Sequence, residues 1–519
     1  MPTDLLEQVK LTVARFQQAV ENKLDDWTAN KTPAGFRALE LDLSAMARQL
    51  CDGVAGAALQ EMVRDAEFQA QACAAARQSE GGPFRSGGAR DVKVALLGGG
   101  DTTVKVPYLK PDRRGRPGRP RGTGRRGPGG TGVYPTLAAL GIWFGYSPAL
   151  AGEIARQVAD SESVRSAREA LARRDIDPGH KQTLRIVNHI ARRAVKQRAR
   201  WFDNVRNSAP VSGGPLAGRR VVVGTDGGRC RMRVPARAGR RRTKTRHRGY
   251  GTPWQEPKVL VIYVIDERGR IEQTWRPVYD GTMEDCNAVF SMLTAYLKAL
   301  GVHEAESLIF VADGARWIWD RVSEMTDELG VDAERVTEVL DWYHAVEALH
   351  EVAGVPANWS AKNKARWLRR ALKLLRAGKV DRLAEHILSL AVGRRAKEIK
   401  SHVGYFERNA DRMQYRQFKS RGVPCGSGAV ESTVRRVVNL RLKSNSKFWL
   451  QDNAEGMLLL RSYLKAGRFD DLFDWSLRVA APWWVDVVGS PLSLPSSATS
   501  ASARSQGAEL QDLRRRRAA

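Results

Sequence analysis

Val221-Val-Val-Gly-Thr-Asp-Gly-Gly228 is the stretch that decides the fold, because an apolar run of strand length ends there in an aspartate and two glycines. Leu308-Ile-Phe-Val-Ala-Asp-Gly-Ala315 repeats the pattern. An aspartate that ends a buried strand is held at the edge of a sheet, and a following glycine lets backbone or a phosphate approach closely. A single Asp-Gly is most often only a turn. Two of them, each after an apolar strand, predict that Asp226 and Asp313 lie within reach of shared cations.

The segments around these two strands alternate between strand and helix patterns. Apolar or alternating runs predict strands at residues 220–225, 229–234, 258–265, 271–278, 307–312 and 336–340. Helical periodicity predicts helices at residues 282–300, 317–329, 345–403 and 428–443. The second half of the chain is therefore expected to be an α/β domain that contains a long helical stretch.

The composition indicates a partner but not a fold. The 519 residues include 85 Lys and Arg against 57 Asp and Glu, a net charge of +28, which indicates a polyanionic partner. The 42% of hydrophobic residues supply more than one core, so wholesale disorder is excluded. No apolar run approaches the roughly 20 residues of a membrane span, and no secretory signal is visible. We expect a cytosolic, multidomain protein with no membrane partner.

The five cysteines bear on metal and redox chemistry. They are odd in number and show no C-x-x-C spacing, which argues against a disulfide framework and a thiolate zinc site. Carboxylate oxygens without Cys or His clusters favour Mg²⁺ or Mn²⁺. Two such ions would suit phosphodiester displacement.

The chain before the first aspartate strand reads as a mostly α-helical DNA-binding region. Residues 1–88 are expected to form helices followed by a Gly-rich break at 79–88, and residues 89–132 a hairpin and an arm rich in Arg, Gly and Pro. Short helices predicted within 133–207 suggest a helix-turn-helix-like module, with a helical spacer as the alternative. Their last member, at 181–201, carries many basic residues that suit phosphate contact. A Gly/Pro/Ser linker at 208–218 marks the boundary.

The arm is the most biased segment of the chain. Residues 113–130 are seven Arg, seven Gly, three Pro and one Thr, so they cannot bury a core. Arg116, Arg119 and Arg121 stand in or beside Arg-Gly-Pro units of the kind that lie in a narrow minor groove. A generic solvated basic linker is the alternative.

A third carboxylate comes from Pro424-Cys-Gly-Ser-Gly-Ala-Val-Glu-Ser-Thr433, where a Gly-Ser-Gly turn starts a helix with Glu431 in its first turn. The alternative for Glu431 is an acid that interacts only with the helix dipole. The residues that follow include three cations expected to contact DNA: Arg435, Arg436 and Lys443. Trp449 could stack an unpaired base, with a place in the core as the alternative.

These motifs together resemble the bacterial insertion-sequence DDE transposases, most closely the Kra-type group related to Mutator-like elements. The similarity covers roughly residues 215–470 and, more loosely, the helical N-terminal part. It implies an RNase H-like (retroviral-integrase) catalytic domain at 215–345 and 425–487, a helical insertion at 346–424, and a disordered tail at 488–519. It also implies Asp226, Asp313 and Glu431 as the metal-binding triad, with metal-dependent DNA cleavage and strand transfer as the activity.

Asp341-Trp-Tyr-His344 is similar to the acid-x-x-His element of Mutator-like transposases. Asp341 and His344 could position each other and touch the scissile-strand phosphate; an ordinary core or surface histidine is the alternative. The chain departs from many relatives in one respect. Where they carry a Cys-rich ribbon after the N-terminal helices, this chain has the Arg-Gly-Pro arm and no cysteine, so zinc-mediated end recognition is in doubt.

A second basic run directly follows the first aspartate strand. Residues 229–248 hold ten Lys and Arg and no acid, which places cations where a DNA backbone would pass. The side chains expected there to contact DNA are Arg240, Arg241, Arg242 and Lys244. A solvated loop is the alternative.

The expected partners are double-stranded DNA, as element ends and as target, and further copies of the chain in a homodimer or higher oligomer. A nucleoid-associated bacterial protein fits this pattern. Two other functions stay open on the sequence: a domesticated, non-catalytic DNA-binding protein, and a structure-specific nuclease of the same fold.

Overall fold

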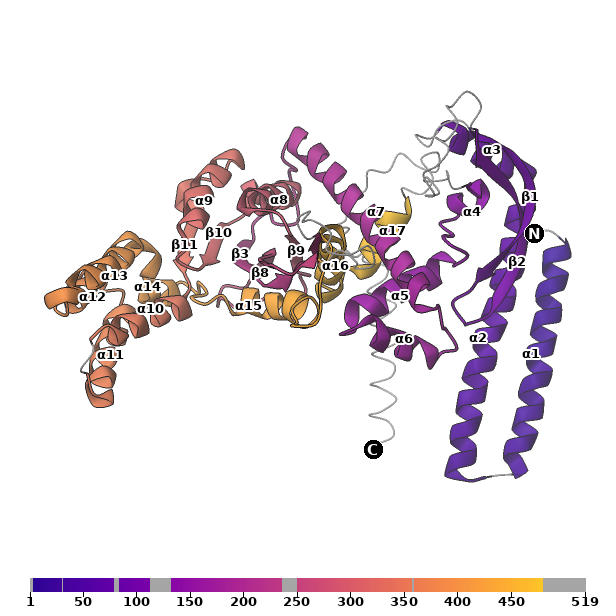
Figure 1. Ribbon diagram of the computed structural model, residues 1–519, viewed down its shortest axis with the longest axis horizontal. Helices are drawn as coiled ribbons and strands as arrows, with labels where there is room; N and C mark the ends of the chain where they lie inside the picture. The colour runs from indigo at the N-terminus through magenta and orange to yellow at the C-terminus, as the bar shows by residue number, and fades with distance from the viewer. Residues whose placement is uncertain are drawn as a thin grey trace, which may run out of the picture.

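The computed structural model describes residues 3–29, 31–78, 84–112, 132–235, 250–356 and 359–478. Two long N-terminal helices lie at one end, a group of helices from the second half lies at the other, and a β-sheet lies between them (Figure 1). None of the helices in these ranges is long and apolar enough to cross a membrane.

A mixed five-stranded sheet carries the two aspartate segments. Its strands, in spatial order, are β11 (Val336–Leu340), β10 (Ser307–Ala312), β3 (Arg220–Gly227), β8 (Lys258–Ile265) and β9 (Val278–Thr282). β10 runs parallel to β3 and to β11, whereas β8 runs antiparallel to both β3 and β9. The strands predicted at 220–225, 258–265, 307–312 and 336–340 are confirmed.

Two of the strand predictions are wrong in their extent. The edge strand expected at 271–278 is instead β9, which begins at Val278, directly after Pro277. Ile271 forms only an isolated bridge, because the polar residues after it fold into a turn in which the Thr274 hydroxyl donates to Glu272. The run expected at 229–234 divides into β4 (Cys230–Arg231) and β5 (Val234–Pro235), which pair with β7 (Trp254–Gln255) and β6 (Tyr250–Gly251).

The two faces of the sheet are covered by different helices. Side chains alternate between the faces along each strand, so neighbouring residues of one strand belong to different cores. Val221, Val223 and Phe310 point to one face, in a core with α8 (Cys286–Ala299), α9 (Arg316–Glu328), α16 (Gln451–Lys465) and α17 (Phe469–Arg478). Val222 and Val311 point to the other face, in a core with the predicted helical stretch. That stretch contains α10 (Trp342–Gly354), α11 (Ala361–Arg376), α12 (Val380–Leu388), α13 (Ala396–Arg408) and α14 (Tyr415–Ser420).

The helix predicted at 428–443 is shorter than expected. It is α15 (Gly428–Val434), continued by a π-helical turn over Arg435–Asn439. The predicted N-terminal helices and hairpin are confirmed as α1 (Thr3–Ala29), α2 (Pro33–Arg64), α3 (Ala66–Gln78), β1 (Phe84–Ala95) and β2 (Asp101–Pro111). β1 begins inside the expected Gly-rich break, since Phe84 to Ser86 already pair with β2.

The helices between the hairpin and the sheet are α4 (Pro135–Ala139), α5 (Pro148–Asp160), α6 (Val164–Ala172) and α7 (His180–Asn207). α4 is short, because Gly141, Phe144 and Gly145 after it take positive φ angles that do not continue a helix. α5 and α7 bury their apolar faces against α16 and α17. The segment at 208–218 therefore connects α7 to β3 across one shared hydrophobic core.

Arg198 on α7 lies inside this core, contrary to the expectation that the basic residues of that helix suit phosphate contact. Its guanidinium donates to Asp280 Oδ1 at 2.6 Å and to the Gly281 carbonyl at 3.0 Å, and it also pairs with Glu455. The side chain of Arg198 is 6% exposed and that of Asp280 is fully buried. The network ties α7 to β9 and α16.

We predict that Arg198→Gln lowers the free energy of unfolding by about 3–5 kcal/mol, because it leaves Asp280 buried without its counter-charge. Urea unfolding followed by circular dichroism measures this loss. Arg200→Gln, at an exposed position on the same helix, is the matched control and is expected to change stability by less than about 0.5 kcal/mol. Equal stability of the two variants would contradict the role of Arg198.

Candidate active site

Asp226 and Asp313 lie at matching positions on neighbouring strands. β3 and β10 pair in parallel with Val223 opposite Phe310 and Gly224 opposite Val311. Asp226 is two residues beyond Gly224, and Asp313 is two residues beyond Val311. The carboxyl ends of parallel strands meet at one edge of a sheet, so the structure brings these two predicted site residues together as expected.

The pKa of Asp226 depends on its burial and on the charged groups around it. Burial is the main cause that raises the pKa of Asp226, and the negative charges of Asp313 and Glu256 raise it further. A hydrogen bond from the Gly227 N–H at 2.6 Å and the nearby His344 act in the opposite direction. The site therefore holds carboxylates that repel one another and are partly buried from water. A bound cation would stabilise this arrangement.

Asp313 is held by its own loop. Its carboxylate accepts the Ala315 N–H at 2.9 Å, and its carbonyl accepts the indole N–H of Trp319 at 3.0 Å. Tyr405 from α13 lies against the next residue, because a Cβ on Gly314 would be 2.5 Å from the tyrosine ring. Burial and then the charge of Asp313 raise the pKa of Tyr405. The Asp313 turn thus requires a glycine and lies against α13.

Glu431 is brought to the same part of the sheet by a close contact between α15 and β3. A Cβ on Gly224 would lie only 2.2 Å from Cγ2 of Val430, so α15 rests directly on the strand that ends in Asp226. Glu431 is exposed, and its Oε1 accepts the Ser427 hydroxyl at 3.3 Å. Glu431 therefore stands over the strand, with its carboxylate turned toward the start of its own helix.

Asp341 connects the elements of the site. It is wholly buried. Its carboxylate caps α10 by accepting the N–H groups of Tyr343 and His344, and it accepts the Ser427 N–H at 2.6 Å. Its own N–H donates to the Ala312 carbonyl at 2.8 Å. The expected contact of Asp341 with phosphate is therefore wrong, because a buried capping carboxylate has no access to DNA; Asp341 positions the ends of β10, α10 and α15.

His344 is the accessible member of the Asp341-x-x-His344 pair. Its side chain is 40% exposed, and its Nδ1 lies 3.3 Å from a carboxylate oxygen of Glu347. It is also one of the charges that act on Asp226. A protonated or neutral imidazole at this place can donate a hydrogen bond to a phosphate beside the aspartates.

Glu256 is a site residue that the sequence analysis missed. Its carboxylate lies against Gly227, since a Cβ there would be 1.8 Å from Glu256 Oε1, and it pairs with Lys258 at 2.9 Å. The antiparallel pairing of Gly227 with Lys258 brings it there. Neither Glu256 nor Tyr405 has a sequence signal, because Glu256 ends no strand and Tyr405 belongs to a distant helix.

The carboxylates at this edge of the sheet meet part of what a divalent cation requires. Asp226 and Asp313 are hard oxygen donors in mutual repulsion, which fits Mg²⁺ or Mn²⁺. Among the described residues, no three His, Cys, Asp or Glu side chains are close enough together to form a complete ligand group. Asp226 and Asp313 thus offer two oxygen ligands for a cation, and Glu431 is the acid that the resemblance assigns as the third.

The residues predicted to bind DNA fall into two groups. Arg435 and Lys443 are exposed beyond α15, whereas Arg436 is half-buried and its guanidinium donates to the Tyr279 hydroxyl at 3.2 Å. Trp449 is half-buried, packs against the core and donates its indole N–H to the Leu442 carbonyl, as its alternative reading expected. The remaining residues lie outside the described ranges: Arg116, Arg119, Arg121, Arg240, Arg241, Arg242 and Lys244.

Compared with protein-family models, curated proteins and solved structures, the chain matches none of them. The site therefore has to be interpreted from its own residues.

We predict that Gly224→Ala inactivates the site while leaving the protein folded, because the new methyl group displaces Val430 and with it Glu431. Val430→Ala in the same chain makes room for that methyl group and is expected to restore at least part of the activity. The measurement is Mg²⁺-dependent DNA nicking by the single and double variants, with circular dichroism as the folding control. Equal activity of Gly224→Ala and wild type would contradict the proposed contact.

A second prediction concerns the stability cost of Asp226. Because its folded-state pKa lies above the ordinary value of 3.8, the native state binds the proton more tightly than the unfolded chain does. The ionised group therefore destabilises the fold increasingly as the pH rises. Without divalent cations, Asp226→Asn should have a higher Tm than wild type at pH 7, and the difference should shrink as the pH falls toward 3.8.

The same thermal scans give a readout of cation binding that does not depend on activity. Mg²⁺ should raise the Tm of the wild type and leave that of Asp226→Asn unchanged. Asp320→Asn, at an exposed position on α9, serves as the control and should respond like wild type. A lower Tm for Asp226→Asn at pH 7, or an equal response to Mg²⁺, would argue against a strained cation site.

Proposed function

We propose that this chain is a DDE-type DNA transposase, which binds the ends of a mobile element and performs metal-dependent DNA cleavage and strand transfer. The observation that carries the proposal is the meeting of Asp226 and Asp313 at one edge of parallel strands, beneath the helix that carries Glu431. The mixed sheet, covered by helices on both faces, supports the RNase H-like part of the proposal.

The proposed reaction has two parts. Water first attacks a phosphodiester at the element end, and the freed 3′-hydroxyl then attacks a phosphodiester of the target DNA. Mg²⁺ or Mn²⁺, two ions by the resemblance, would supply activation of the attacking oxygen and stabilisation of the leaving oxygen. Asp226, Asp313 and Glu431 would hold them.

The chain's own residues supply the positioning. Asp341 fixes where α10 and α15 begin, so that His344 and Glu431 keep their places relative to the strand ends. His344 would donate a hydrogen bond to a non-bridging oxygen of the scissile phosphate. Gly227 and Gly314, which follow the aspartates, let Glu256 and Tyr405 pack closely against the strand ends.

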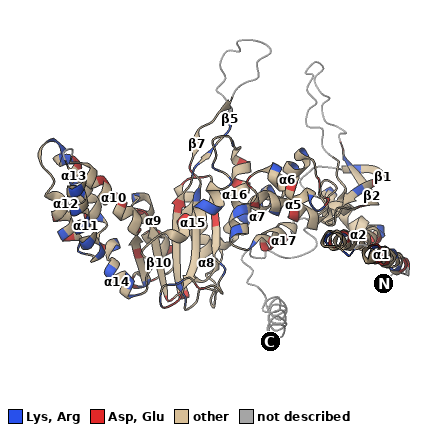
Figure 2. Ribbon diagram, turned by 90° about the horizontal axis from the view of Figure 1, so that it is seen from below, with Lys and Arg blue, Asp and Glu red and all other residues tan. Residues whose placement is uncertain are grey.

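The DNA backbone is proposed to pass over cations that surround this edge. Arg435 and Lys443 are exposed beyond α15. On the short β4–β7 ribbon, the Arg231 guanidinium is 5.5 Å from the ring centre of Trp254. Figure 2 shows this ribbon at the edge of the sheet domain, beside β5. Such backbone contacts weaken as the salt concentration rises. Both element ends have to be brought together before transfer, so a homodimer or higher oligomer is part of the proposal.

The test uses duplex DNA from both flanks of the gene, with Mg²⁺ and the full chain. Asp226→Asn and Asp313→Asn should each reduce nicking by at least roughly 100-fold, since each removes a carboxylate that would hold the metal ions. DNA binding, measured by fluorescence anisotropy, should stay within about two-fold of wild type, because neither aspartate donates to a phosphate.

Asp320→Asn is the matched control and should retain full nicking and binding. Joining of the cut ends to a plasmid distinguishes a transposase from a structure-specific nuclease, which would cut without joining. Full activity in either aspartate variant would contradict the site assignment, and DNA binding without any cutting by wild type would favour a non-catalytic DNA-binding protein.

A further inference from the structure

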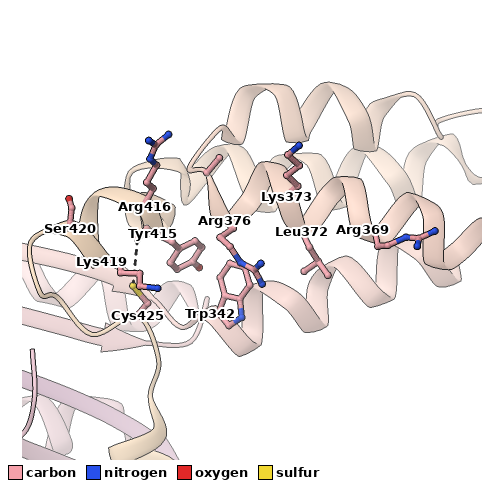
Figure 3. A pocket seen from close by; sticks show the side chains of 11 residues that line it. Trp342, Arg369, Leu372, Lys373, Arg376, Tyr415, Arg416, Lys419, Ser420 and Cys425 are labelled. Carbon is pink, nitrogen blue, oxygen red and sulfur yellow. Dashed lines mark hydrogen bonds between the residues drawn. The ribbon is translucent and has the colours of Figure 1, made fainter.

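A second site is formed by the helical insertion. A cavity of about 870 Å³ lies between the start of α10, the last turns of α11, and α14 with the segment after it. Figure 3 shows Trp342 and Arg376 against each other in the middle of this cavity, with Lys419 and Cys425 on the side opposite α11. The volume falls within the range of small-ligand pockets, which is about 300–1,000 Å³.

The lining of this pocket is strongly cationic. Five of its residues are basic and none is acidic; the basic ones are Arg369, Lys373, Arg376, Arg416 and Lys419. Within the ranges that the structure describes, none of the five forms an ion pair. α11 as a whole contains seven Lys and Arg and no acid, and Figure 2 shows this concentration of positive charge over α11. An anionic ligand is therefore favoured.

The floor of the pocket is aromatic and apolar. Tyr415 packs edge-on against Trp342, with ring centres 5.0 Å apart, and donates its hydroxyl to the Leu340 carbonyl at 3.0 Å. Tyr415 is buried and Trp342 is half-buried, so the tyrosine holds an indole that still reaches the cavity. The Arg376 guanidinium lies 5.5 Å from the indole centre. The guanidinium lies over the indole ring, and a planar guanidinium and an indole are both groups on which a nucleobase can stack.

The pocket shares a wall with the candidate active site. The backbone N–H of Trp342 donates to the Cys425 carbonyl at 2.8 Å. Trp342 directly follows Asp341, and Cys425 lies two positions before Ser427. The Ser427 N–H donates to the Asp341 carboxylate, and the Ser427 hydroxyl donates to Glu431. A ligand in the pocket would therefore touch the segments that position Glu431.

We propose that this pocket binds an unpaired nucleotide of a DNA strand, with its base against Trp342 and Leu372 and its phosphates near Arg376 and Lys419. The proposal deepens the proposed function and rests on it for the identity of the strand. The cations lie on two helices, α11 and α14, so they can follow a backbone through the pocket, whereas a single free phosphate would need only one of them.

The test measures binding of a single-stranded oligodeoxynucleotide of about 12 nucleotides, with one 2-aminopurine, to the full-length chain. Trp342→Ala should weaken binding roughly 5- to 100-fold and remove the quenching of 2-aminopurine, because the stacking surface is lost. Arg376→Gln and Lys419→Gln should each reduce the slope of log affinity against log salt by about 0.7. Trp342→Phe keeps an aromatic ring and should retain most of the binding. It therefore shows whether the loss of affinity in Trp342→Ala comes from lost stacking.

Arg366→Gln is the matched control, since this exposed arginine lies on α11 outside the pocket. It is expected to leave the quenching unchanged and to alter affinity less than Arg376→Gln does. The proposal is overturned if Trp342→Ala and Arg376→Gln bind and quench like Arg366→Gln. It is also overturned if free deoxyadenosine monophosphate saturates the pocket as tightly as the oligonucleotide does, which would indicate a free nucleotide as ligand.

Binding and cleavage are scored separately, so the two proposals can fail separately. If the proposed function is wrong, the flanking DNA is not cut, yet the single strand can still bind and quench through Trp342. If the pocket proposal is wrong, Asp226→Asn abolishes cutting while Trp342→Ala binds and cuts like wild type.

Discussion

The parallel, in-register pairing of β3 with β10 is the constraint on which the site depends. It brings two aspartates, 87 positions apart in the sequence (313 − 226 = 87), to the same level of one sheet edge. Burying the Asp226 carboxylate, and then placing it near Asp313, costs free energy and raises the pKa of Asp226. Such a cost at the edge of an otherwise well-packed sheet is typical of a functional site rather than of a stabilising one.

Everything else at the site depends on fitting helices to that edge. Gly224 lets α15 contact β3 directly, and Gly314 makes room for the Tyr405 ring. Asp341 then uses one buried carboxylate to fix the start of two helices. Because Asp341 also stands next to Trp342, the same short segment borders both the acidic edge and the basic pocket. The two surfaces therefore cannot be repositioned independently.

Much of the sheet could be predicted from the sequence, because β3, β8 and β10 contain apolar runs of strand length bounded by turn residues. The meeting of Asp226 with Asp313 also followed from the pattern, since both aspartates end such runs. The sequence did not predict features that depend on contacts between residues far apart in the chain. It did not reveal that Arg198 is buried, because the local sequence of a basic helix does not distinguish an arginine that faces the core from one that faces solvent.

Other features were missed for the same reason. Glu256 reaches the site only through the pairing of β3 with β8, and the pocket around Trp342 exists only because α11 and α14 meet there. The expected phosphate contact of Asp341 failed because helix capping competes for its carboxylate. The predicted boundary at 208–218 coincides with a change of pattern, yet the hydrophobic core continues across it from Trp143 to Trp475.

The most direct measurement of the central claim is affinity cleavage of the polypeptide by Fe²⁺ bound in place of Mg²⁺. With ascorbate and peroxide, the bound iron generates radicals that cut the chain next to its ligands. Cuts are expected beside Asp226, Asp313 and Glu431 in the same sample, and they should be suppressed by excess Mg²⁺ and lost in Asp226→Asn. Cuts elsewhere, or cuts at these places that persist in Asp226→Asn, would contradict a shared metal site.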